Sequence, residues 1–452
     1  MKRTITAIAF VLILSVSEAS AQNYQTSYFL DNYLYSYRIN PAQGNDKSFF
    51  GFVINNLSLT ENGNVGIGNF LYPTENGKLV TGLNRSISPA RFLDNLPDAT
   101  GLGLHLNESL FACGTQIGKA YTTLEINLKA NVLASVPKDL MTFLKSGTNG
   151  NTYNFDKLHI GADSYAEIAL GYSRDINNMV RVGGRLKALV GLASVHANFS
   201  KAEMTLTRSS LHVTTTAELS SAADLLRFGT DEDGYLDFSP EIGTIGVAGF
   251  GAAVDLGVSV KPVKGLNVTA SVTDLGGISW KKGVYATSSV DAVYEGVDEI
   301  HINENIGDDF EDVLDDFEDI TKFTIQENSG KSFKSLPCTV NLGARYQMPF
   351  YDRLSVGILG TFHFDRYNPY NNVRFGATIT PVKFVSLTGN AGVGTFGPVA
   401  GAALCLNLPV IHITIGADTF LGKYGTIQDI PVPINPHTLQ LNLGVNIAFR
   451  KV

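Results

Sequence analysis

Cysteine and long apolar runs are both scarce in this chain of 452 residues. The three cysteines, Cys113, Cys338 and Cys405, are odd in number and far apart, so they provide no disulfide framework. The main apolar stretch, from Ile5 to Val16, is much shorter than the roughly 20 residues that a transmembrane helix requires. The sequence therefore argues against a disulfide-stapled domain and against a helical membrane anchor.

Recognisable catalytic and ligand-binding motifs are missing as well. The eight histidines show no spacing typical of metal ligands, and the sequence contains neither a nucleophile elbow nor a glycine loop for phosphate. No basic stripe suits a nucleic acid. We therefore expect no catalytic residue, metal, cofactor or nucleic-acid partner, and we predict that the chain is not an enzyme. A serine–histidine pair assembled across strands is the catalytic arrangement that spacing alone leaves open.

The N-terminus has the parts of a secretory signal peptide. Positive charge in the first three residues precedes the apolar stretch, and small residues at Ala19 and Ala21 suit a cleavage site. We predict a signal peptide over residues 1–21, cleaved after Ala21. Because the next residue is Gln22 rather than a cysteine, no N-terminal lipid anchor is expected.

Apolar and polar residues alternate in many segments of the remaining chain. In the last of them, TLQLNLGVNIAFR, every second residue from Leu439 to Phe449 is apolar, while Gln440, Asn442 and Asn446 fall on the other side of an extended strand. Similar alternation occurs in TLEINLKANV and VRVGGRLKALVGL. These segments are long enough for tilted membrane strands, which need about 9–11 residues.

The segments give about fourteen strands, an even number as outer-membrane barrels require. They are residues 49–57, 103–115, 120–133, 161–174, 179–198, 243–260, 265–279, 336–348, 353–364, 371–380, 383–392, 399–407, 410–420 and 438–449. Short links such as QIGK, DINN and KPVK alternate with mostly longer ones. Short periplasmic turns and longer external loops are typical of up-and-down barrels. Because two external links are short, the count could range over roughly 12–16 strands.

We therefore predict an all-β fold: a transmembrane, antiparallel, up-and-down β-barrel over residues 49–452. In lipid, an open sheet edge would leave backbone groups unpaired at several kcal/mol each, so the sheet must close. Closure turns the polar face towards the lumen and the apolar face towards lipid. A soluble sandwich or β-helix also alternates, but its hairpins need no one-sided difference in length. The predicted location is the outer membrane of a Gram-negative bacterium, with its lipid as partner.

Short helices are predicted in the external loops. Ser88 and Pro89 read as N-cap and first helical residue before ARFLDNL, and a similar start precedes KDLMTFLK. Further helices are expected over residues 220–228 and within the insert 291–319. This insert holds 13 of the 42 acidic residues, and it belongs to a long acidic external loop, 280–335. Its spacing fits no EF-hand, so a solvated loop is the simpler interpretation, with binding of divalent cations left open.

Charged side chains fall on the predicted lumen face. Glu125 and Lys129 share one strand, and Arg181, Arg185 and Lys187 share another. Three cations on one face make the second strand a candidate site for an anionic group or a charged solute. The alternative, which we favour, is that these charges pair across the lumen, because burying an isolated ion costs several kcal/mol. Further charges expected on this face are Asp255, Arg345, Arg374 and His412.

Several stretches resemble an uncharacterised family of Bacteroidetes outer-membrane proteins, a domain of unknown function (DUF5723-like). They are YSYRINPA, GNFLYP, GKLVTGL, VTDLGGISWKKG and SYAEIALGYSRDIN, where Ser164 stands in place of the family's alanine. The family is similar in turn to FadL-type channels for hydrophobic compounds and to the PorV-type barrel of type IX secretion. The resemblance implies an outer-membrane barrel with a plugged lumen, and it brings no established substrate.

The resemblance also implies that the N-terminal segment, residues 22–48, is a plug. Asn40 and Pro41 belong to an Asn-Pro-Ala element similar to the one that precedes the first strand in these relatives. The segment is rich in aromatic residues, among them Tyr33, Tyr35 and Tyr37. Rings that carry a hydroxyl suit contact with an apolar ligand and packing against the inner wall equally well.

Two functions are consistent with these features. The leading hypothesis is a passive channel for hydrophobic or amphipathic small molecules, with ligand contacts among the lumen and plug residues named above. The alternative is a non-transporting scaffold, or a secretion-associated barrel, that binds a partner protein through its external loops. The sequence leaves open the solute, the state of the lumen and the oligomeric state.

Overall fold

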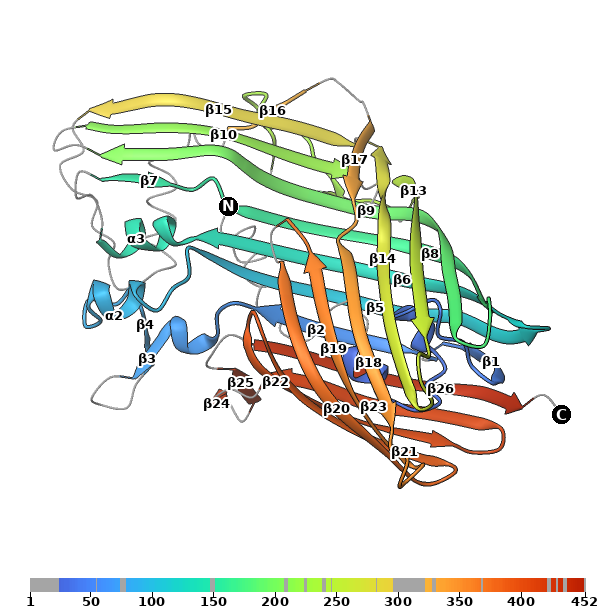
Figure 1. The fold of residues 1–452 in the computed structure, drawn as a ribbon. Helices are drawn as coiled ribbons and strands as arrows, with labels where there is room; N and C mark the ends of the chain where they lie inside the picture. The colour runs from blue at the N-terminus through green and yellow to red at the C-terminus, as the bar shows by residue number, and fades with distance from the viewer. Residues whose placement is uncertain are drawn as a thin grey trace.

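A closed antiparallel barrel of 14 strands forms the body of the protein, as the alternation predicts (Figure 1). The computed structural model describes residues 24–53, 55–73, 79–146, 151–206, 210–222, 226–237, 241–244, 246–281, 283–295, 322–326, 331–366, 369–420, 424–427, 430–433 and 437–450. The signal peptide predicted over residues 1–21 and most of the acidic insert 291–319 lie outside these ranges.

Each wall strand pairs with its neighbours in the chain, and the last strand pairs with the first. In order around the barrel the wall consists of β1 (Lys47–Phe52) with β2 (Leu57–Gly63), β5 (Ala99–Ile117), β6 (Ala120–Pro137), β8 (His159–Asp175), β9 (Val180–Leu206), β13 (Gly249–Val260), β14 (Leu266–Lys281), β18 (Cys338–Gln347), β19 (Leu354–Phe364), β20 (Tyr370–Val382), β21 (Val385–Gly394), β22 (Gly397–Asn407), β23 (Ile411–Phe420) and β26 (His437–Arg450). Pairing of Lys47 with Arg450 and of Leu57 with Leu443 closes the sheet.

The first wall strand differs from its prediction. Instead of one strand over residues 49–57, the chain forms β1 and β2, separated at Val53, whose φ is +40°. A β-branched residue at positive φ is strained, so it marks a true interruption of the strand. Asn55 and Asn56 at this interruption are buried, and Asn56 contacts residues of the lumen.

The two faces of the wall have opposite chemistry. On β26, Leu441, Val445 and Ile447 are 40–46% exposed on the outer face, whereas Gln440 and Asn442 are 2–3% exposed towards the lumen. The apolar face therefore looks outward, where only lipid can cover it favourably. Among the described residues, no helix is long and apolar enough to span a bilayer.

Beyond the wall, at the end with the long connections, the sheet continues as an external extension (Figure 1). The outer part of β9 pairs with β10 (Ser210–Ala222), which pairs with β15 (Val284–Glu295). The helix predicted over residues 220–228 is wrong in the described part, because Ser220–Ala222 end β10 and Leu226–Arg227 form β11. Cross-strand pairing with β9 outweighs the local helical pattern there. Smaller strands near this end are β7 (Thr152–Asn154), β12 (Glu241–Ile242), β16 (Thr324–Ile325) and β17 (Lys331–Ser335).

Two short helices lie over the same end. Helix α2 (Pro89–Leu93) begins with Ser88 as N-cap, whose hydroxyl accepts from the Arg91 N–H, as predicted. Helix α3 (Lys138–Ser146) follows directly after β6. The Lys145 ammonium donates to the carbonyls of Leu83 and Asn84, and partial burial lowers its pKa. The remaining short elements are β3 (Leu71–Pro73), β4 (Leu79–Thr81), β24 (Tyr424–Ile427), β25 (Ile430–Pro433) and the 3₁₀ turn η4 (Ile67–Asn69).

Contact of β26 with lipid has a measurable consequence. We expect Leu441→Arg to destabilise the folded protein, lowering its free energy of unfolding in vesicles by about 2–4 kcal/mol, the cost of arginine near the bilayer midplane. Val263→Arg, in the exposed turn after β13, should cost only about 0–1 kcal/mol, as expected at the interface. Urea titration of refolded vesicles would measure both values. Equal costs at the two positions would contradict lipid contact at Leu441.

Candidate functional site

The residues before the first strand lie inside the barrel. This lumen segment, residues 24–46, contains the 3₁₀ turns η2 (Gln25–Tyr28) and η3 (Ser36–Arg38), and nearly all of residues 24–42 are buried. Its side chains and carbonyls hydrogen-bond to inward-facing groups on both halves of the wall, from Glu125 on β6 to Asp418 on β23. The segment therefore contacts several parts of the inner wall at this level.

The three predicted tyrosines contact the wall through their hydroxyls. Tyr35 donates to Asn446 Oδ1 at 2.6 Å, Tyr37 donates to Glu125 Oε1 at 2.8 Å, and Tyr33 accepts from Asn56 Nδ2 at 2.7 Å. Their rings pack in one buried cluster with Phe49. In this arrangement the three tyrosines pack the lumen segment against the wall.

The Asn-Pro-Ala element is seated against two glycines of neighbouring strands. The Asn40 amide donates to the carbonyl of Val258 at 3.0 Å, while its Oδ1 accepts from the Ala42 N–H. A methyl group on Gly257 would overlap Asn40 Oδ1, and one on Gly183 would overlap the Pro41 carbonyl. Glycine is therefore required at both wall positions for this close approach of the backbone.

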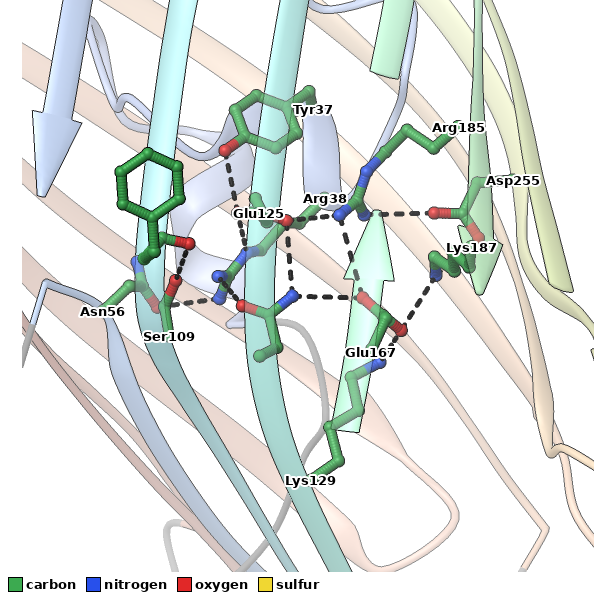
Figure 2. A network of polar contacts seen from close by, with 12 residues as sticks. Tyr37, Arg38, Asn56, Ser109, Glu125, Lys129, Glu167, Arg185, Lys187 and Asp255 are labelled. Atoms are coloured by element: carbon green, nitrogen blue, oxygen red, sulfur yellow. Dashed lines mark hydrogen bonds and ion pairs between the residues drawn. The ribbon is translucent and has the colours of Figure 1, made fainter. Parts of the chain in front are cut away.

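Most of the predicted lumen charges belong to one buried ionic network (Figure 2). It joins four cations to four carboxylates: Arg38, Lys129, Arg185 and Lys187 with Glu125, Glu167, Asp255 and Asp274. Arg38, from the lumen segment, pairs with Glu125 at 2.9 Å, and Arg185 pairs with the same carboxylate from the wall. The predicted pairing of these charges is thus observed, but it joins neighbouring strands on one side of the barrel, from β6 to β14, and does not cross the lumen. Arg38 ties the lumen segment to this side of the wall.

A β-bulge supplies one carboxylate of this network. Asp274 has φ +63°, and the β13–β14 register shifts beside it. The bulge turns Asp274 into the lumen, where its carboxylate accepts from Lys187 Nζ at 2.7 Å and its N–H donates to Asp255 Oδ1 at 2.7 Å. Strict alternation after the inward Thr273 would have pointed this charge at lipid.

Arg181 lies apart from Arg185 and Lys187, although all three are on one face of β9. It forms an ion pair with the half-exposed Asp175 at 3.3 Å, near the short-turn end. The three cations therefore do not form one binding site.

Two further polar contacts hold the other side of the lumen segment. Asp31 pairs with Arg345 on β18, and Thr26 hydrogen-bonds to Asp418, which also pairs with Arg374 at 2.8 Å. With the Arg38 contact, they anchor the segment at three places around the wall.

Cavities lie on both sides of the lumen segment. At the short-turn end, a cavity of about 260 Å³ is lined by Asp31, Arg181 and Lys261. At the other end, an external pocket of about 320 Å³ is lined by His105, Asn131, His159, His196, Trp280 and Lys334, among others. A cavity of about 50 Å³ below it shares His105 and Asn131 with the external pocket, and Gln25 of the segment and Lys129 also line it.

The external pocket was not anticipated from the sequence. Of the ten candidate residues, Lys129 lines the 50 Å³ cavity, and none is in the lining of the external pocket. The signal was present, since His105, His159 and His196 fall on the polar face near the ends of predicted strands. A search for metal-ligand spacing does not detect side chains that converge from different strands.

Loss of the Arg38 charge should loosen the lumen segment. Arg38→Met leaves Glu125 buried with only one cationic partner, and removal of one member of a buried pair costs about 3–5 kcal/mol. We expect a lower unfolding temperature and faster amide exchange over residues 24–46. Arg181→Met, which breaks a partly exposed pair, should cost about 0–1 kcal/mol. Indistinguishable exchange in the two variants would refute the anchoring role of Arg38.

A side chain at Gly257 should displace the Asn-Pro-Ala element. Gly257→Val places a branched side chain where Asn40 Oδ1 lies, so we expect increased amide exchange around residues 38–44. Gly389→Val is the matched control, because a Cβ there meets open space, and its effect should stay within about 0.5 kcal/mol. Unchanged exchange in the Gly257 variant would show that the segment seats without this contact.

Comparison with known proteins gives similar solved structures and one family model. The toluene transporter TodX of Pseudomonas putida is 9% identical, with 96% of this chain and 99% of that chain covered and a TM-score of 0.45. A FadL homologue of Pseudomonas aeruginosa is 11% identical over 96% of this chain and 100% of that chain, with a TM-score of 0.42. No curated protein matches the sequence. The model of a family of unknown function, DUF5723, matches residues 41–418, and the chain therefore belongs to that family.

Proposed function

We propose that this protein is a passive channel of the outer membrane for hydrophobic or amphipathic small molecules, with the lumen segment as its plug. The observation that carries the proposal is the position of that segment. It lies in the lumen between an external pocket and a cavity at the short-turn end, which is the periplasmic end in barrels of this type. A solute captured outside would reach the periplasm by displacing the plug.

The contacts of the plug suit displacement. Besides the ion pairs of Asp31 and Arg38, many are hydrogen bonds to a polar wall, such as those of Tyr33 and Tyr35. Water can replace such partners, so their net contribution is only about 0.5–1.5 kcal/mol each for a typical hydrogen bond. A plug held in this way can be firmly seated and still leave the wall without unfolding the barrel.

The named relatives are compatible with this proposal in what their descriptions say. TodX is described as a toluene transporter, and another similar chain as a monoaromatic hydrocarbon channel. The proposal for this chain rests on its own lumen and not on theirs.

The external extension supports a second candidate function. Strands β10 and β15 with the outer part of β9 form a sheet beyond the barrel wall, a larger structure than a pore requires. A non-transporting scaffold would use this surface to hold a partner protein. Crosslinking in intact outer membranes, followed by pull-down, would compare the full chain with one in which a Gly-Ser linker replaces residues 207–242. A stoichiometric partner lost only in the variant would favour the scaffold.

Removal of the plug should make the barrel permeable to polar solutes that the intact protein excludes. In proteoliposomes we expect the intact protein to admit a small amphiphile such as 4-phenyl-1-butanol and to exclude sucrose. Deletion of residues 24–46 should admit sucrose as well, because the polar lumen would fill with water. Vesicle swelling would measure sucrose entry, and dialysis the amphiphile. Failure of the intact protein to admit any apolar solute would overturn the channel.

A further inference from the structure

The external pocket has both hydrogen-bonding and apolar groups in its lining. One wall, from β5, β6, β8 and β9, carries imidazole, amide and carboxylate groups: His105, Asn131, His159, Asp163, His196 and Asn198. The rest of the lining is mixed: Ile278 and Trp280 of β14 and Leu336 and Pro337, which follow β17, form an apolar cluster, and Lys334, Ser335, Asp365 and Arg366 lie in the same part of the lining. A molecule that fills this pocket therefore contacts hydrogen-bonding groups near His105 and Asn131 and an apolar cluster near Trp280 and Leu336.

The charges that line the pocket are balanced. Asp163 and Asp365 face Lys334 and Arg366 in the same lining, so the pocket carries no net charge when the histidines are neutral. Of these groups, Asp163 Oδ2 lies 2.9 Å from His196 Nε2, and Lys334 donates to the neutral Ser194 Oγ at 2.9 Å. A ligand with a net charge would disturb this balance, and burial of its unbalanced charge would cost free energy.

The polar wall retains hydrogen-bonding capacity. His105 is 6% exposed; its Nδ1 contacts Asn131 Oδ1 at 2.9 Å, while its Nε2 is buried without a partner in the described part of the chain. A buried polar atom without a partner costs free energy, and a ligand hydroxyl can both donate to and accept from an imidazole. A hydrocarbon would cover the same nitrogen without forming a hydrogen bond to it.

We propose that the external pocket selects small uncharged amphiphiles that bear a hydroxyl group, over hydrocarbons and over carboxylates of the same size. The hydroxyl would lie on the His105–Asn131 side, and the apolar part on the Trp280–Leu336 side. This inference rests on the proposed function, and it names the class of molecule that the channel would capture.

The chain provides its own reporter for a test. Trp280 lines the pocket and is the single tryptophan of the sequence, so its emission reports directly on occupancy. The intact protein in detergent would be titrated at pH 7, below the pKa of about 8 to which burial lowers the Lys334 ammonium, so that Lys334 keeps its charge. The probes are butylbenzene, 4-phenyl-1-butanol and 4-phenylbutyrate, with free concentrations fixed by dialysis to remove the effect of micelle partitioning.

We expect the alcohol to bind about tenfold more tightly than either of the other two, which is roughly the effect of one well-formed hydrogen bond. His105→Leu combined with Asn131→Leu removes both members of a hydrogen-bonded pair and should abolish the preference. Thr152→Val with Thr205→Val, a hydrogen-bonded pair in the external extension, is the matched control and should keep it. If the first double variant does not fold, the order of affinities in the intact protein remains decisive.

Equal or tighter binding of the hydrocarbon, or tightest binding of the carboxylate, would overturn the inference. The two proposals can fail separately. Absence of flux with the expected affinities would overturn the channel alone, whereas flux without any response of Trp280 would overturn the assignment of the pocket alone.

Discussion

Lipid forms no hydrogen bonds, and this constraint determines both faces of the molecule. The wall must pair all of its backbone groups in a closed sheet, and its polar side chains can only point inward. A lumen with this many charges then needs internal partners, because each unpaired buried ion would cost several kcal/mol. The ionic network around Glu125 and Arg185 meets that requirement, and Arg38 brings the lumen segment into the same network.

The closed sheet and the polar lumen together explain why the N-terminal segment is so polar for a buried element. Its aromatic rings fill volume, while its hydroxyl, carboxylate and guanidinium groups face a wall that already presents polar atoms. An apolar segment would leave those wall atoms without partners. The segment therefore presents the same kind of polar groups as the lumen face of the wall, but it forms no strand and does not pair with the sheet.

The wall strands could be predicted from sequence because a strand between lipid and lumen must alternate. Strand β20, predicted over 371–380, spans Tyr370–Val382, and most other ends agree similarly. The rule fails where lipid is absent, which is why β10 and β15 in the external extension were missed. It also fails at Asp274, because a bulge reverses the faces that strict alternation assigns. The external pocket required knowledge of which strand ends converge, and spacing along the chain does not contain that information.

The pair of glycines beneath the Asn-Pro-Ala turn has a consequence for the family as a whole. Two absent side chains on adjacent strands, Gly183 and Gly257, set the depth at which that turn can rest. The residues of the turn and the residues at these two wall positions must therefore change together over evolutionary time. A relative that retains Asn-Pro-Ala should retain a residue without a β-carbon at both places, and a bulky residue at either should coincide with a rebuilt turn.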